Sequence, residues 1–290
     1  MAATLLSEFE TNIAWHLKMN EAISTTTKPV TKAQLYQLIY DFSERLSRMC
    51  AEFDSSLGQK NGVISLTDGT SQYTDFCSDF ISSAGKGWLL KTYSRDEIPI
   101  ANTETIIDYS PSSSNETEPC EYTVGPNGEI NFYQTPDDSY TFYLPYWYHQ
   151  SKPTAATFTA SAITKANPCA ITTSASHCLQ TGDRVYISGE TGMTQLNGLY
   201  FTVTKTGATT FTLNGINSTS YSVATPNATI SVVLPFNGAF DDLIMEYCVM
   251  RILNRDEYQM PFEQAWFQNL MIEARKIIIA RKDRTLKVCR

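Results

Sequence analysis

The stretch TGDRVYISGETGMTQLNGLYFTVTKTGATTFTLNG, residues 181–215, decides how this chain is divided. Val, Ile, Tyr, Phe and Thr alternate along it with polar residues, and Gly, Asn and Asp separate the runs. This pattern is typical of β-hairpins, because alternate side chains face one side of a sheet and tight turns need residues that tolerate positive φ. Together with its Thr- and Ser-rich flanks, the stretch predicts a β-rich cassette over residues 154–233.

The segments before the cassette begin with helices. Residues 4–23 have helical spacing, with Ser7 and Glu10 as an expected capping box. A second helix is predicted from Thr31, because Thr31 and Gln34 have the spacing of an N-cap and its reciprocal partner. Its apolar stripe recurs at helical intervals and consists of Leu35, Leu38, Ile39, Phe42, Leu46 and Met49.

A helical hairpin is predicted after the cassette, from residue 234 onward. Phe240, Leu243 and Tyr247 lie on one face of its first helix, and Pro261 fits the first turn of its second. Between the N-terminal helices and the cassette, residues 57–73 look turn-rich. Three strand candidates follow at residues 120–124, 129–134 and 139–149, with Gly128 available for a turn, which predicts an antiparallel meander.

These elements predict an α+β fold class: a helical core with an antiparallel β meander, plus an inserted all-β module. The core is expected to be discontinuous, built from residues 1–153 and 234–290. The module is expected over residues 154–233, because insertions at exposed connections are well tolerated.

Composition excludes several classes of protein. The net charge of −8 argues against a general nucleic-acid binder, and no apolar run approaches the length of a membrane helix. The chain shows no phosphate-binding loop, no nucleophile elbow and no zincin motif, and none of its seven cysteines forms a CxxC pair. For His16, His149 and His177 we expect surface or packing roles, and for Asp137 and Asp138 a turn role. The prediction is a protein that is not an enzyme, with no catalytic residue, cofactor or metal.

The C-terminus is basic, unlike the rest of the chain. Residues 275–290 carry seven Lys or Arg and one Asp. Spacing alone leaves three interpretations open: a solvated helix end favoured by the helix dipole, a nucleic-acid contact, or a docking arm for an acidic partner. The charged residues of this last segment are Arg281, Lys282, Arg284, Lys287 and Arg290.

The order of several loose motifs resembles the head-to-tail adaptor proteins of tailed bacteriophages. The resemblance covers roughly residues 30–150 and 234–284. Its motifs are the run Leu89 to Ile98, the strand with Pro119 and Tyr122, the hairpin Ile130 to Tyr143, and the helical pair Leu234 to Arg281.

The resemblance implies a virion structural protein at the head–tail junction, synthesised in the host bacterial cytoplasm. Such a protein forms a ring under the portal, most often of twelve copies, extends the DNA channel and provides a platform for tail attachment. The implied partners are the portal protein, tail or nozzle proteins, other copies of the chain and passing DNA, with no membrane. Adaptor C-termini reach along the portal, which makes the five basic residues portal-docking candidates.

The cassette carries a separate resemblance, to a small β module common in phage structural proteins and also associated with a domain of ubiquitin-activating enzymes. The residues that carry it are Gly189, Gly192-Met193, Leu196-Asn197-Gly198 and Phe211-Thr212-Leu213. No ubiquitin chemistry is implied, because no catalytic cysteine context accompanies them. The module supports an alternative function, a tail-side adhesion or fibre-attachment protein that binds through residues 154–233.

Overall fold

The computed structural model forms two compact units, and the chain passes between them more than once. Unit 1 comprises Met1–Leu46 and Gln150–Ile277, and unit 2 comprises Ser47–His149 and Ile278–Arg290. Within these bounds the structure describes residues 4–19, 23, 30–74, 76–90, 94–101, 116–125, 128–254 and 260–282. No helix among these residues is both long and apolar enough to cross a membrane.

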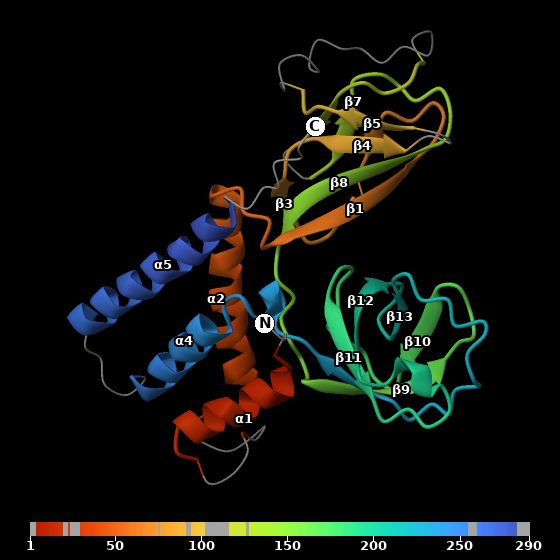
Figure 1. The fold of residues 1–290 in the computed structure, drawn as a ribbon. Helices are drawn as coiled ribbons and strands as arrows, with labels where there is room; N and C mark the ends of the chain where they lie inside the picture. The colour runs from red at the N-terminus through yellow and green to blue at the C-terminus, as the bar shows by residue number, and fades with distance from the viewer. Residues whose placement is uncertain are drawn as a thin grey trace. The chain divides into compact units, whose positions relative to one another are not determined.

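Unit 1 contains a closed six-stranded antiparallel barrel, drawn in green to blue in Figure 1. Around the barrel the strands follow the order β10-β13-β12-β11-β14-β9. Their bounds are β9 Thr157–Ile163, β10 Cys169–Thr173, β11 Arg184–Ser188, β12 Leu199–Lys205, β13 Thr210–Leu213 and β14 Thr229–Val232. A single 3₁₀ turn, η1 Thr194–Leu196, interrupts the connection between β11 and β12.

Side chains at alternate positions of the strands point inward and fill the barrel. Val185 and Ile187 of β11 and Val203 of β12 are completely buried, while the residues between them face outward. Phe211 and Leu213 of β13 fill the same interior and are equally buried. The period-2 pattern that predicted strands in residues 181–215 is therefore the pattern that separates the barrel core from its outer wall.

Closure brings the two ends of the cassette together. β14 pairs with β9 through Thr229↔Thr159, Ile230↔Phe158 and Ser231↔Thr157, and the Val232 amide donates to the Ala156 carbonyl at 2.9 Å. The chain thus enters and leaves the barrel on adjacent strands. On leaving, Val233 forms an antiparallel bridge with Leu5, which joins the exit of the barrel to the N-terminal segment.

The helices of unit 1 include α1 Leu6–His16, the N-terminal part of α2 Lys32–Glu52, α4 Asp241–Leu253 and most of α5 Met260–Lys282. The rings of Phe42 and Tyr247 stack with centroids 4.5 Å apart, which packs α2 against α4. The Arg45 guanidinium lies 5.2 Å from the centre of the Phe267 ring on α5. A short turn, η2 Pro235–Gly238, connects the barrel exit to α4.

One of the two expected capping boxes is confirmed. The Thr31 amide donates to Gln34 Oε1 at 3.0 Å, and the Gln34 amide donates to Thr31 Oγ1 at 3.4 Å. The Ser7–Glu10 box is wrong: the N-cap of α1 is Leu5, two residues before Ser7, and the Leu5 amide donates to Glu8 instead. Glu10 is buried, where it accepts a hydrogen bond from the Tyr36 hydroxyl and pairs with Lys32 Nζ at 2.8 Å. Its carboxylate therefore joins α1 to α2.

Unit 2 is built from two antiparallel sheets that share one apolar core. The larger has the order β1-β8-β4-β5, with β3 also paired to β8, and the smaller has the order β2-β7-β6. The shared core includes Tyr122, Phe132 and Phe142. The strand bounds are β1 Gln59–Leu66, β2 Gln72–Tyr73, β3 Phe80–Ser83, β4 Gly87–Leu90, β5 Arg95–Ile98, β6 Tyr122–Val124, β7 Ile130–Phe132 and β8 Tyr140–Tyr148.

The expected α+β fold class with a helical core is wrong. The described residues are mostly β, with a closed six-stranded barrel and two further sheets beside four α-helices. The single meander is wrong as well. The three predicted strands exist as β6, β7 and β8, but β8 pairs with β1, β3 and β4 and belongs to the other sheet.

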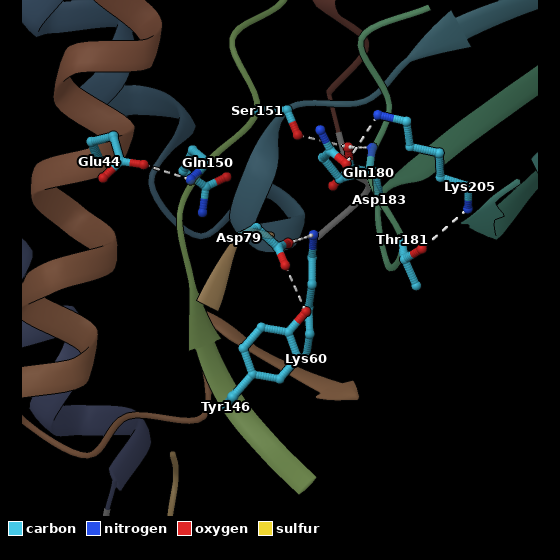
Figure 2. A network of polar contacts seen from close by, with 10 residues as sticks. All are labelled: Glu44, Lys60, Asp79, Tyr146, Gln150, Ser151, Gln180, Thr181, Asp183 and Lys205. Atoms are coloured by element: carbon cyan, nitrogen blue, oxygen red, sulfur yellow. Dashed lines mark hydrogen bonds and ion pairs between the residues drawn. The ribbon is translucent and has the colours of Figure 1, made fainter. Parts of the chain in front are cut away.

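Strand β1 accounts for much of this error. Lys60, Asn61 and Gly62 are poor strand formers, so residues 57–73 look turn-rich. Tertiary contacts override that preference, because β1 pairs with the whole length of β8. Figure 2 shows the contact that makes Lys60 acceptable there: Asp79 pairs with Lys60 Nζ at 3.1 Å and accepts from the Tyr146 hydroxyl at 2.9 Å.

The adjacent ends of the barrel predict that it can be excised. Replacing residues 154–232 with a short Gly/Ser linker should leave a chain that still melts cooperatively, because the linker spans neighbouring positions and closure depends weakly on loop length. Val233 is kept, since it pairs with Leu5. Circular dichroism during thermal unfolding is the measurement. The discontinuous core of residues 1–153 and 234–290 stays a prediction. A broad, non-cooperative melt of the shortened chain would contradict it.

Candidate functional site: one end of the barrel

A buried carboxylate organises the end of the barrel at which β11 stops. Glu190 is only 2% exposed, and its Oε1 accepts hydrogen bonds from the amides of Gly192 at 2.9 Å, Met193 at 3.1 Å and Thr225 at 2.7 Å. The first two donors belong to its own loop, and the third belongs to the loop before β14. One side chain therefore fixes two loops that are distant in sequence.

Asn197 completes this arrangement. The Glu190 amide donates to Asn197 Oδ1 at 2.9 Å, and Asn197 Nδ2 donates to the Glu190 carbonyl at 2.7 Å. Gly192 is required by close approach, because a Cβ there would lie 2.2 Å from the Val223 carbonyl oxygen. The spacing of Gly192, Asn197 and Gly198 that distinguishes the cassette is thus the signature of a packed pair of loops.

The outer wall next to these loops carries an aromatic pair and a cation. Tyr186 of β11 lies opposite Tyr200 of β12, and their ring centroids are 5.1 Å apart. The Arg184 guanidinium lies 5.2 Å from the centre of the Tyr200 ring, and Arg184 Nη1 donates to Asn237 Oδ1 at 2.7 Å. Cation–π contact and a hydrogen bond therefore both orient Arg184.

Large apolar side chains remain exposed at the same end. Leu199 is 50% exposed, Tyr200 37% and Val223 74%. Leu199 lies opposite Ile187 near the end of β11, and Val223 belongs to the loop that packs on Gly192. We call this set the barrel contact surface: Arg184, Tyr186, Leu199, Tyr200 and Val223.

His177 is a packing residue of the barrel, as expected. It is 6% exposed and contacts the ring of Phe211 edge-on, with centroids 5.4 Å apart. Neither ring nitrogen has a hydrogen-bond partner among the residues described in the structure. Burial lowers the pKa of His177, because the charged imidazolium would lose its hydration.

The structure gives Asp137 and Asp138, which the sequence analysis assigned to a turn, hydrogen bonds within that turn. Asp137 accepts from the Tyr140 hydroxyl at 2.7 Å and Asp138 from the Ser139 amide at 2.6 Å, which confirms their turn role. Tyr146 and Trp147 of β8 are buried in unit 2. Within the described ranges, no group of three or more His, Cys, Asp and Glu residues could hold a metal ion.

The basic C-terminus contributes little to the described structure. Arg281 and Lys282 lie in the last turn of α5. Arg284, Lys287 and Arg290 lie outside the described residues. The portal-docking role of these five residues stays a prediction.

Sequence reasoning missed Glu190 as the organiser of the barrel end. Its signal was present in the run from Gly189 to Gly198, where one acid stands between glycines and is followed by Asn197. What could not be read from the sequence is the third donor, the Thr225 amide, which lies 35 residues away along the chain.

Comparison with known families finds one match, and it lies inside the barrel. Residues 166–224 match the model of the ubiquitin-activating enzyme E1 FCCH domain. The matched region contains Glu190, Asn197 and strands β10 to β13. No curated protein matches the chain.

This match overturns the expected resemblance to bacteriophage head-to-tail adaptors, which is wrong. The motifs that carried the resemblance are short and loose, and the described residues are mostly β, with a closed barrel, instead of the helical core that was expected. The family match points to a β domain of ubiquitin-activating enzymes and covers 59 of the 290 residues.

Removing the Glu190 carboxylate should destabilise the barrel. In Glu190→Ala three amides lose their acceptor, but of the three donor residues only Met193 is buried. A buried unsatisfied group costs about 1–3 kcal/mol, so we expect a loss of that order. Glu190→Gln keeps an acceptor oxygen and should lose much less. Urea unfolding midpoints measure both variants, and equal midpoints for Glu190→Ala and the unmodified protein would contradict the structural role.

His177 should make stability depend on pH. The pKa of His177 is lower in the folded chain than in the unfolded chain, so the unfolded chain takes up the proton at a higher pH. The free energy of unfolding therefore falls as pH drops below about 6.5. His177→Phe should remove this part of the slope between about pH 7 and pH 5. The exposed His16, changed to Gln, is the control. Melting temperatures across this range decide the matter, and an unchanged slope in His177→Phe would refute the assignment. Burial raises the pKa of Asp241, which by itself makes stability rise as pH falls. This opposite contribution is the same in the unmodified protein, His177→Phe and His16→Gln.

Proposed function

We propose that the protein is a non-enzymatic structural protein that attaches to a protein partner through the barrel contact surface. The observation that carries this proposal is the Tyr186–Tyr200 pair with Arg184 on the outer wall of the barrel, together with the exposure of Leu199 and Val223 at its end. Tyrosine and arginine are enriched at the centres of protein interfaces, and grouped exposed apolar side chains typically mark binding surfaces.

Rigidity supports the same proposal. Glu190 holds both loops at this end of the barrel, and Asn237 orients Arg184. A surface that is ordered before binding loses less conformational entropy when the complex forms, so more of the contact energy appears as affinity.

The chemistry of the surface suggests the chemistry of the partner. The partner should present an apolar side chain to Tyr200, together with a carboxylate near Arg184. The guanidinium has five N–H groups, so its bond to Asn237 leaves donors for such a carboxylate. Opposite charges at an interface favour the correct orientation of the two proteins.

This proposal corresponds to the attachment function that the sequence analysis gave as its alternative. The virion setting, the ring of probably twelve copies, the portal, the tail or nozzle proteins and the passing DNA stay predictions. The match to a domain of ubiquitin-activating enzymes supports a β module, and the chemistry of those enzymes is not part of the proposal.

Photo-cross-linking can test the surface directly. A benzoylphenylalanine probe at Leu199, in cells where the protein is naturally produced, should give one discrete cross-linked partner that mass spectrometry identifies. With that partner purified, Tyr200→Ala and Arg184→Ala should each weaken binding roughly ten-fold, as expected for central interface residues.

The control probe belongs at Ala162 on β9, an exposed position on the strand opposite β12 in the barrel. The proposal fails if the two probes capture the same proteins, or if Tyr200→Ala and Arg184→Ala bind the purified partner as tightly as the unmodified protein.

A further inference from the structure

Unit 2 contains a pocket that none of the preceding assignments uses. Its volume is about 760 Å³, within the roughly 300–1,000 Å³ range of small-molecule sites. It lies between the segment that leads into β3 and the turn that follows β6. The lining residues share a mixed aromatic and hydroxyl character; the principal ones are Thr74, Phe76, Ser78, Phe80, Ser82 and Gly128.

The aromatic part of the lining is fixed by packing. The Phe76 and Phe80 rings contact each other edge-on with centroids 5.5 Å apart, and each also contacts Tyr146, at 5.2 and 5.6 Å. Tyr146 is held in turn by its hydrogen bond to Asp79. The two phenylalanine rings therefore keep their positions without a ligand, as a stacking surface should.

The polar part of the lining has unused hydrogen-bonding capacity. The hydroxyls of Thr74, Ser78 and Ser82 make no hydrogen bond within the described part of the chain, and all three residues line the pocket. Each hydroxyl can donate one hydrogen bond and accept two. A ligand with several hydroxyls could therefore bond to all three.

The charge of the lining residues limits the class of ligand that the pocket can bind. No described lining residue is charged. Asp79, which stands between the lining residues Ser78 and Phe80 in the sequence, pairs with Lys60 Nζ at 3.1 Å. An ionic ligand would find no counter-charge among the described lining residues and would lose hydration, which is costly. A neutral ligand carries no such cost.

Gly128 lines the pocket beside the ring of Phe80. Gly128 has a φ of +82°, and a Cβ at this position would lie 3.7 Å from Cδ1 of Phe80. The backbone therefore passes close to the aromatic ring without a side chain covering it, in a conformation that only glycine adopts readily.

We propose that this pocket binds a neutral, polyhydroxylated ligand, such as one sugar ring of a glycan. The apolar C–H face of the ring packs against Phe80, and its hydroxyls bond to Thr74, Ser78 and Ser82. The site is separate from the barrel contact surface and extends the function beyond attachment to a protein partner.

The test uses the full chain and ligand-observed NMR with glucose, galactose, mannose and N-acetylglucosamine. Glucosamine and glucuronate serve as charged counterparts, and adenosine as an aromatic one. At least one neutral sugar should bind with a Kd on the order of 1 mM, as expected for a small neutral ligand with few contacts, and both charged sugars should bind more weakly.

Ser82→Val is the diagnostic variant, because valine suits a strand and removes one hydroxyl. It should weaken sugar binding roughly three- to ten-fold, the value of one hydrogen bond. Ser65→Val is the matched control, since Ser65 is exposed on β1 of the same unit and does not line the pocket. Ser78→Ala provides a second variant if Ser82→Val folds poorly.

Three results would overturn the proposal: no binding of any neutral sugar, stronger binding of a charged sugar or of adenosine, or equal affinity in Ser82→Val, Ser78→Ala and the unmodified protein. Because the pocket belongs to unit 2 and the cross-linking probe to the barrel, failure here leaves the proposed attachment function unaffected.

Discussion

The pairing of β14 with β9 is the contact on which the architecture of unit 1 depends. It closes the barrel, so that no strand edge remains exposed there and every strand has two neighbours. It also returns the chain to its point of entry, where Val232 bonds to Ala156 and Val233 pairs with Leu5. A module whose ends meet in this way can be accommodated between a strand and a helix without separating the segments that flank it.

Buried and partly buried polar groups in the described part of the chain include two kinds. Glu190, Glu10 and Asp79 are surrounded by donors from different segments, and each joins parts of the chain that are distant in sequence. Such groups specify one arrangement, because any other leaves donors or acceptors unpaired. His177 is of the second kind, packed among aromatic rings without a hydrogen-bond partner for either ring nitrogen among the described residues. It can stay buried because it is neutral at the usual pH, and it links barrel stability to pH.

Local signals predicted much of the secondary structure. The Thr31–Gln34 box, the apolar stripe of α2 and the strand pattern of residues 181–215 were all readable, because each depends on residues close in sequence. The barrel contact surface was not readable. The cross-strand partners Tyr186 and Tyr200 are separated by the loop around Glu190, and Asn237, which orients Arg184, is 53 residues from it. The pocket of unit 2 is equally hidden, because segments from different sheets line it.

The sequence by itself determined that residues 154–233 are β-rich, that helices precede β1 and follow the barrel, and where several tight turns fall, since periodicity and glycine placement act over a few residues. Tertiary structure alone decided which strands pair. Strand β8 was expected to continue a meander with β7, yet it lies in the other sheet between β1 on one side and β3 and β4 on the other. Pairing partners depend on the burial of whole sheet faces and on contacts such as Lys60 with Asp79, and neither can be found by reading the chain locally.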